Sequence, residues 1–239
     1  MKILILGGTA EARDLAERLT ALGHDVTTSL AGRTRKPAIP AGQMRVGKFG
    51  GIPGLVGYLR AAGIERLVDA THPYAGLISV NAVRAAPQSG VPLVRYMRPA
   101  WVEPEGAGWT HVPSVEAAAE ALPVGANVFI TTGHDGLGHF VERDDCRMVA
   151  RLIEPPTIDL GHIKWLEDGP PYRLDAERRL FDKYGFTHLV TKNSGGERTW
   201  PKMVVAQERG VRVTVVARPV YGPAVEVGTV EEAVAAVVG

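Results

Sequence analysis

Short apolar runs alternate with longer segments of helical periodicity along the first half of the chain. Lys2–Leu6 is the first apolar run, and residues 11–22 repeat apolar positions at the spacing of one helix face. The same patterns predict strands at Asp25–Leu30, 44–46, 65–69 and 91–94, and helices at 54–62 and 74–86. Strands that alternate with helices in this way are typical of a parallel sheet with right-handed crossovers.

Proline and glycine become frequent between residues 99 and 113, which makes this stretch the predicted domain boundary. The alternation then starts again. Strands are predicted at Asn127–Thr131, 147–153, 187–191 and 211–216, and helices at 114–122, 175–184, 201–209 and 229–238. We therefore predict an α/β fold of two Rossmann-like lobes, 1–98 and 99–239, with mainly parallel sheets and a cleft between them. The closing helix at 229–238 could pack on either lobe.

Composition narrows the classes of partner. The 239 residues are 45% hydrophobic and 22% charged, with a formal net charge of +1, so we expect no nucleic-acid partner. No apolar stretch is long enough to span a bilayer and no signal peptide is visible, so we expect a cytoplasmic location without membrane contact. The single Cys146 and the spacing of the histidines predict no metal site.

The turn after the first strand has the composition of a phosphate-binding loop. Gly7 and Gly8 let the backbone turn tightly and approach a ligand. Thr9 or Ala10 then opens a helix with Glu11 in its first turn, and the start of a helix attracts anions. The turn fits the dinucleotide fingerprint G-x-G-x-x-G only in part, so a plain strand–helix turn without a ligand is the alternative.

The end of the second strand indicates which dinucleotide binds. Enzymes that select NAD usually place an acidic residue there, but Asp25 lies at the opposite end of this strand. The residues at the carboxyl end are Ser29, Ala31, Gly32 and Arg33. A hydroxyl and cations suit the 2′-phosphate of NADP, and Arg33 is the first choice for that contact. The predicted cofactor is therefore NADP or NADPH on the first lobe; a solvated basic loop is the alternative.

The loop after the third strand carries Phe49 and Gly50. In a Rossmann arrangement this strand end lies beside the adenine, so the loop could pack on the base and Gly50 is a candidate cofactor contact. Phe49 could equally anchor a flexible loop.

The end of the fourth strand concentrates polar side chains. Asp69, Thr71, His72 and Tyr74 follow each other closely, and Pro73 suits the first turn of a helix. The nicotinamide half of a dinucleotide would lie near this strand end, so Thr71 and His72 are candidate cofactor contacts. His72 and Tyr74 are also candidate proton donors, since imidazole exchanges protons near neutral pH. A structural histidine and a packing aromatic are the alternatives.

Two loops of the second half also follow predicted strands. The first contains Thr132, Gly133 and His134; the second contains Lys192, Asn193, Ser194, Gly195 and Gly196. A cation, neutral polar groups and glycines suit a ligand with carboxylates or phosphates. All of these residues except His134, together with Tyr74, are candidate substrate contacts, and His134 is a third candidate proton donor. Structural loops of the same composition are the alternative.

These motifs together resemble the precorrin-6A reductase family of corrin-ring (cobalamin) biosynthesis. The resemblance runs in order along the chain through the stretches 7–12, 31–33, 69–75, 131–133 and 192–196. The stretches 69–75 and 192–196 are the specific ones, whereas the glycine turn alone is a weak signal.

The resemblance implies an NADPH-dependent reductase of one double bond in a polycarboxylate tetrapyrrole, which gives a dihydro product. It implies the tetrapyrrole as the small-molecule partner, with neighbouring enzymes of the pathway as possible protein partners. Lys192, Asn193 and Arg98 would fix the substrate face against the nicotinamide, and His72, Tyr74, His134 or a bound water would supply the proton.

Two other functions compete with this interpretation. Another NADP-dependent reductase or epimerase of the extended short-chain type would normally carry a Tyr-x-x-x-Lys pair, and no tyrosine here has a lysine four residues later. A non-catalytic NADP sensor would need no polar substrate loop such as residues 191–197.

Overall fold

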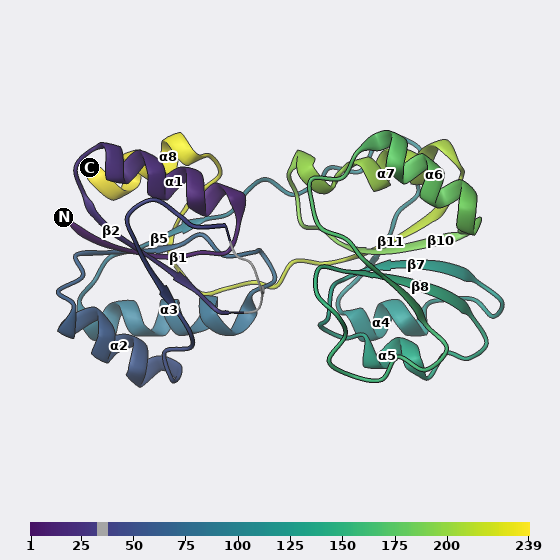
Figure 1. The fold of residues 1–239 in the computed structure, drawn as a ribbon, viewed down its shortest axis with the longest axis horizontal. Helices are drawn as coiled ribbons and strands as arrows, with labels where there is room; N and C mark the ends of the chain where they lie inside the picture. Colours follow the sequence, from purple (N-terminus) through teal and green to yellow (C-terminus); the bar gives the residue numbers. More distant parts are fainter. Residues whose placement is uncertain (33–37) are drawn as a thin grey trace. The chain divides into compact units, whose positions relative to one another are not determined.

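The computed structural model describes residues 1–32 and 38–239, and the chain forms two compact units. The first unit contains Met1–Pro99 and Pro219–Gly239, and the second contains Ala100–Arg218. Figure 1 shows the helices and strands of each unit. No helix among the described residues is long and apolar enough to cross a membrane.

A six-stranded, wholly parallel sheet forms the centre of the first unit, in the order β12-β5-β4-β1-β2-β3. Its strands are β1 Lys2–Leu6, β2 Asp25–Leu30, β3 Gln43–Val46, β4 Arg66–Asp69, β5 Leu93–Tyr96 and β12 Val225–Val227. Its helices are α1 Ala10–Ala21, α2 Gly51–Ala61, α3 Gly76–Ser89 and α8 Val230–Val238. The strand order is that of a dinucleotide-binding sheet, with the order reversing between β1 and β4.

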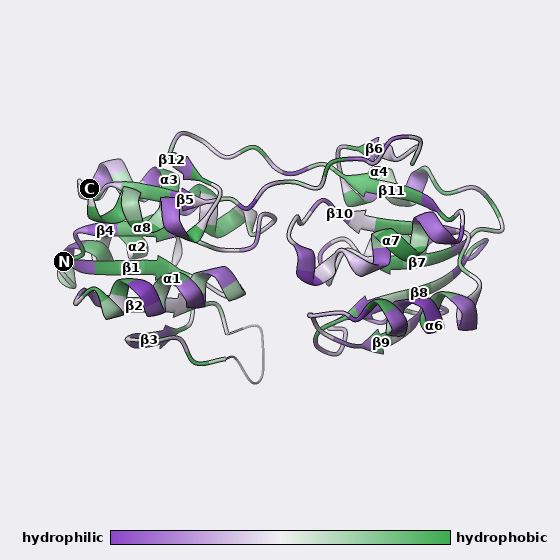
Figure 2. Cartoon of the chain, turned by 90° about the horizontal axis from the view of Figure 1, so that it is seen from above, coloured by the Kyte–Doolittle hydropathy of each residue, from purple (hydrophilic) through white to green (hydrophobic). Residues whose placement is uncertain are grey.

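The alternation of side chains on β1 divides the core of this unit into two layers. Ile3 and Ile5 pack with buried residues of α1 and α8, and Leu4 and Leu6 pack with those of α2 and α3. Figure 1 shows these two helix pairs on opposite faces of the sheet. In Figure 2 the central strand β1 is hydrophobic throughout most of its length, whereas the edge strand β3 alternates polar and apolar residues.

A second six-stranded parallel sheet forms the centre of the second unit, in the order β6-β11-β10-β7-β8-β9. Its strands are β6 Thr110–Val112, β7 Asn127–Thr131, β8 Arg147–Leu152, β9 Lys164–Glu167, β10 His188–Lys192 and β11 Arg212–Val216. Its helices are α4 Val115–Glu120, α5 Gly138–Val141, α6 Leu174–Tyr184 and α7 Pro201–Glu208, and a 3₁₀ turn spans Glu197–Thr199. Phe129 on β7 stacks on Phe186 with ring centroids 4.7 Å apart.

The two sheets share one topology. The five consecutive strands β1 to β5 have the same spatial order in their sheet as the five strands β7 to β11 have in theirs. In each sheet a sixth strand pairs with the last strand of this series and forms the edge. That edge strand is β6, from the chain entering the second unit, and β12, from the chain returning to the first. Ligands of such sheets bind where the strand order reverses, which is at the ends of β1 and β4 and of β7 and β10.

The predicted fold class, α/β with parallel sheets, is confirmed. The boundary of the predicted second lobe differs from the structure, because residues 219–239 belong to the first unit. Strand β12 pairs with β5, and α8 buries Ala233 and Val237 in the core layer of α1. The pattern also missed β6, β9, β12 and α5, which are short, and placed β5 two residues too early.

Candidate functional site

The glycine turn after β1 leads directly into α1. A Cβ at Gly7 would lie 2.8 Å from Cγ2 of Thr28, so the strand packing leaves no room for a side chain there. Gly8 has a φ of +116°, which favours glycine, and a Cβ there would meet nothing within 4 Å. The backbone at Gly8 is therefore open to an approaching group.

Thr9 holds this turn against the end of β4. Its hydroxyl donates to the carbonyl of Ala70 at 2.8 Å and accepts from the N–H of Ala12 at 3.1 Å, which caps α1. The Thr9 hydroxyl therefore forms its two hydrogen bonds within the protein and stabilises the conformation of the turn. The N–H groups of Ala10 and Glu11 lie in the first helical turn, where no intrahelical partner exists.

Glu11 forms an ion pair with Arg98. Nη1 of Arg98 lies 3.1 Å and 3.2 Å from the two carboxylate oxygens of Glu11, and both side chains are largely buried. Arg98 thus lies beside the start of α1, and the substrate contact expected from the resemblance stays a prediction. The pair places a positive charge beside the carboxylate that stands at the start of α1.

The carboxyl end of β2 is occupied by the buried Ser29 and by Ala31 and Gly32, which are exposed. Arg33, the predicted phosphate contact, lies outside the described residues. The structure brings a different cation to this place: Nη1 of Arg45, on β3, donates to Oγ of Ser29 at 2.7 Å. Sequence reasoning missed Arg45, although a parallel β2–β3 pair places it opposite Ser29.

The loop after β3 is anchored by Phe49. Its ring packs edge-on against Tyr58 of α2 with centroids 5.3 Å apart, and the guanidinium of Arg45 covers it at 3.8 Å. Gly50 follows as the N-cap residue of α2. The structure thus gives Phe49 the anchoring role that the sequence left as one of two alternatives.

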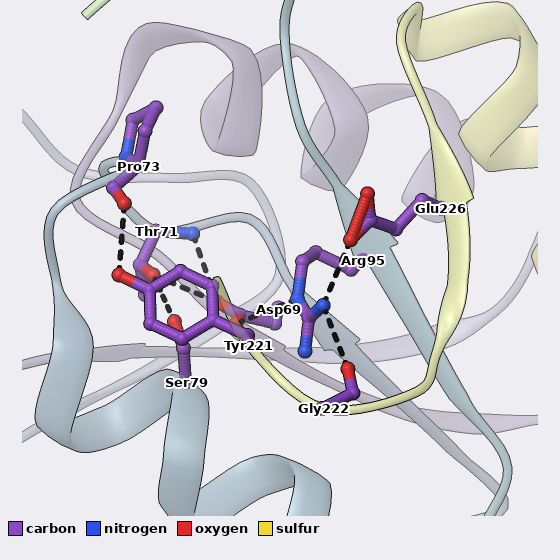
Figure 3. A network of polar contacts seen from close by, with 8 residues as sticks. All are labelled: Asp69, Thr71, Pro73, Ser79, Arg95, Tyr221, Gly222 and Glu226. Atoms are coloured by element: carbon purple, nitrogen blue, oxygen red, sulfur yellow. Dashed lines mark hydrogen bonds and ion pairs between the residues drawn. The ribbon is translucent and has the colours of Figure 1, made fainter. Parts of the chain in front are cut away.

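A buried polar network fixes the end of β4 (Figure 3). Oδ1 of Asp69 accepts from the hydroxyl of Thr71 at 2.7 Å and from its N–H at 3.3 Å. The hydroxyl of Thr71 also lies 3.4 Å from that of Ser79 on α3. Thr71, a predicted cofactor contact, therefore holds the turn that follows the strand.

The chain that returns from the second unit closes the same network. Arg95 of β5 is 1% exposed; its Nε lies 3.7 Å from Oδ2 of Asp69, and its Nη1 donates to Glu226 at 2.9 Å and to the carbonyl of Gly222 at 3.1 Å. The hydroxyl of Tyr221 donates to the carbonyl of Pro73 at 2.8 Å. Burial, and then the charge of Asp69, raise the pKa of Tyr221, which stays a proton donor to this carbonyl. The loop at 72–74 is thereby fastened to the returning chain.

His72 and Tyr74 lie next to each other in that loop. His72 is exposed, and its Nδ1 accepts the N–H of Tyr74 at 3.3 Å, which puts the proton of a neutral ring on Nε2. The two rings are 5.8 Å apart between centroids. Both side chains therefore present proton-exchanging groups at the carboxyl end of β4.

The two predicted loops of the second unit meet at the ends of β7 and β10. Nζ of Lys192 lies 3.6 Å from Oδ2 of Asp135, which stands beside the exposed His134. Thr132 is 3% exposed, and its hydroxyl has no hydrogen-bond partner among the described residues. Gly133 follows Thr132, and Ser194, Gly195 and Gly196 continue from Lys192. The structure thus gathers these candidates at one strand-order reversal.

Asn193 connects the second loop to the two ends of the second unit. Its side chain accepts from the N–H of Trp101 at 2.8 Å and donates to the carbonyl of Trp101 at 3.1 Å. Its carbonyl accepts from Nε of Arg218 at 2.7 Å, and Nε1 of Trp101 donates to the carbonyl of Gly196 at 2.9 Å. Asn193 therefore fixes the shape of its loop, and its contact with the substrate stays a prediction.

Sequence reasoning also missed a buried charge cluster near this loop. Arg151 and Glu177 form a hydrogen-bonded ion pair, and the guanidinium of Arg151 covers the ring of Tyr172 at 3.5 Å. Lys202, 4% exposed, donates to the carbonyl of Thr199 at 3.1 Å. Burial, and then the charge of Arg151, lower the pKa of Lys202 to about 7. The local pattern along β8, α6 and α7 does not distinguish these buried charged residues from surface ones.

The described residues contain no group of histidine, cysteine, aspartate and glutamate side chains that could hold a metal ion. The glycine turn, the open backbone at Gly8 and the arginine beside Ser29 fit a dinucleotide that carries an extra phosphate.

Comparison with known proteins shows which family the chain is similar to. The model of the family "Precorrin-6x reductase CbiJ/CobK" matches residues 2–238. A precorrin-6A reductase from Rhodococcus erythropolis is 39% identical over 239 residues, with 99% of this chain and 96% of the relative covered. A cobalt-precorrin-6A reductase from Priestia megaterium is 29% identical over 256 residues, with 99% and 98% covered. The solved structure of a CobK precorrin-6A reductase superposes with a TM-score of 0.92 at 35% identity, covering 98% of this chain and 95% of that one.

Proposed function

The chain belongs to the precorrin-6x reductase family CbiJ/CobK and is an oxidoreductase of cobalamin biosynthesis, and on this premise we propose that it uses NADPH to reduce one carbon–carbon double bond of precorrin-6A. The observation that carries the proposal is the glycine turn at the strand-order reversal of the first unit, in a chain of a reductase family. The other reductase or epimerase and the sensor have no comparable support.

The first unit binds the cofactor in this proposal. Backbone groups from Gly7 to Glu11 face the pyrophosphate, with Thr9 holding the turn and Arg98 balancing Glu11. The adenosine end lies toward Ser29, Ala31, Gly32 and Gly50. Thr71 and His72 flank the nicotinamide end. When bound, NADPH supplies the hydride, so the task of the protein is orientation and proton supply.

The second unit supplies the groups that bind the carboxylates of the macrocycle. Lys192, the last residue of β10, supplies the cation, and the N–H groups at Ser194, Gly195 and Gly196 in the loop that follows can donate to anions. Thr132 adds a hydroxyl without a partner among the described residues, and Gly133 leaves its backbone open beside it. Asn193 keeps this loop in shape through Trp101.

Proton delivery to the reduced double bond is assigned to one of three side chains, or to a water that one of them holds. His72 and Tyr74 belong to the cofactor-binding unit, and His134 to the other. Of these, His72 carries its proton on Nε2 when neutral, because Nδ1 accepts a backbone N–H.

The metal-free macrocycle is the proposed substrate. The relative named as a precorrin-6A reductase is 39% identical to this chain, whereas the one named as acting on the cobalt-containing form is 29% identical. A cobalt-containing macrocycle would be reduced at a lower kcat/KM if this assignment is right.

The test is an anaerobic assay of the purified protein with precorrin-6A and NADPH. We expect one NADPH oxidised per macrocycle and a product heavier by two hydrogens. Binding of NADPH without turnover of either macrocycle would favour the sensor and contradict the proposal.

A further inference from the structure

Arg45 stands at the carboxyl edge of the first sheet, between β2 and β3. The register places it opposite Ser29, and the hydrogen bond between Nη1 and Oγ of Ser29 is 2.7 Å long. The side chain is half-buried, so its guanidinium is held in place while part of it stays accessible. It therefore lies at the strand end where a sheet of this order receives the adenosine ribose.

The guanidinium is held by neutral groups. Nη1 also donates to the carbonyl of Gly47 at 3.1 Å, Nη2 lies 3.4 Å from the carbonyl of Lys48, and one face covers the ring of Phe49 at 3.8 Å. No carboxylate in residues 1–32 or 38–239 forms an ion pair with it. A fixed positive charge without a balancing anion is what a site for a dianionic phosphate requires.

Ser29 adds a second donor to the same place. Its Oγ accepts from Arg45, which leaves its own proton for another acceptor. The acidic side chain that would select NAD at this strand end is absent from the described part of the loop, since Asp25 lies at the other end of β2, opposite Lys2.

We propose that Arg45, supported by Ser29, binds the 2′-phosphate of NADP(H) and selects it over NAD(H). This inference rests on the proposed cofactor and assigns that part of its recognition to a residue of β3, in addition to the predicted loop residue Arg33. Arg45 is then a specificity-determining residue that touches the cofactor away from the reacting atoms.

The test is calorimetric binding of adenosine 2′,5′-bisphosphate and of adenosine 5′-monophosphate to the full chain. Arg45→Gln removes the charge and keeps a donor toward Ser29, and Arg45→Lys keeps the charge. The matched control is Arg60→Ala, since Arg60 on α2 also donates to a carbonyl, that of Gln88. We expect R45Q to weaken the bisphosphate about tenfold to a hundredfold, R45K less, and neither to change the monophosphate.

The outcomes separate two failures. If the wild type binds NADPH and the bisphosphate and R45Q binds both adenosine ligands as the wild type does, the role of Arg45 is wrong and the cofactor proposal stands. Equal weakening of both ligands by R45Q, or a matching loss with R60A, would also overturn the role, because it would indicate a structural effect. If the wild type binds neither NADPH nor the bisphosphate, the proposed cofactor itself is wrong.

Discussion

Individual residues of the glycine turn have different physical roles. Gly7 is required by the packing against Thr28, Gly8 by its backbone conformation, and Thr9 by a hydroxyl that joins the turn to Ala70. Composition predicts the turn, because glycine pairs after a buried strand have few other uses. The separate roles of Gly7 and Thr9 depend on contacts with Thr28 of β2 and with Ala70 after β4, and the local sequence does not predict these contacts.

Gly8→Ala should weaken NADPH binding. An alanine at a φ of +116° is strained, so the turn must shift and its N–H groups lose their alignment. We expect the dissociation constant for NADPH to rise about tenfold or more, measured by fluorescence of the reduced nicotinamide. The control is Gly23→Ala, with a φ of +83° at the far end of α1, which should cost similar stability and leave binding intact. Equal binding by both variants would remove Gly8 from the site.

Lys202 should make stability depend on pH. Its pKa is about 7 in the folded protein and 10.5 ordinarily, so between these values unfolding takes up a proton. Stability should therefore rise with pH across this window, by up to about 1.4 kcal/mol per pH unit, and stay flat with respect to this group below it. Lys202→Met should abolish this rise in urea unfolding between about pH 6 and pH 9. A wild type and variant with parallel pH profiles would show that Lys202 keeps its proton in the fold.

At the scale of elements, the buried strands could be predicted from the sequence, and the short exposed ones could not. The strands β1, β2 and β7 match the predicted bounds because each is a short, mostly buried run whose ends are marked by polar or glycine residues. Strand β12 escaped because Val225 and Glu226 are exposed and the strand is three residues long. Arg45 and Tyr221 were missed for a different reason. Arg45 reaches Ser29 through the pairing of β2 with β3, and Tyr221 reaches Pro73 from the returning segment; the local sequence encodes neither contact.

Tyr221→Phe tests whether the returning segment positions the loop at 72–74. Loss of the hydrogen bond to Pro73 should cost about 1 kcal/mol of stability and let the loop move. We expect a several-fold slower single-turnover hydride transfer with unchanged affinity for adenosine 2′,5′-bisphosphate. Tyr58→Phe, which removes a hydroxyl without a described hydrogen-bond partner from the same unit, is the control. A rate equal to that of the wild type would mean that the loop keeps its shape without Tyr221.

At the scale of the whole molecule, each unit completes its sheet with a strand from outside its five-strand series. The first unit is therefore assembled from two chain segments that are separated by the entire second unit. Periodicity predicted both sheets but placed residues 219–228 with the second lobe and left the closing helix at 229–238 open between the two, because α8 is apolar on one face wherever it packs. Only the partner surface on α1 and the pairing of β12 with β5 decide its place.

Ala233→Asp should unfold the first unit selectively. Ala233 is fully buried in the layer of α1 and α8, so an aspartate there would cost about 3 kcal/mol or more. Hydrogen exchange should rise in peptides that cover β1 and β4 and stay low in those that cover β7 and β10. Ala235→Asp, at an exposed position of the same helix, should behave like the wild type. Faster exchange in both units to the same extent would contradict the independence of the two cores.

The central claim is that a hydride passes from NADPH to a carbon of the macrocycle on this protein. The direct measurement uses NADPH with deuterium at both C4 positions, precorrin-6A and the purified chain, with mass spectrometry of the product. We predict one deuterium on a ring carbon of the dihydro product and one hydrogen from solvent. A reduced product without deuterium, or no reduced product while NADPH is bound, would contradict the account.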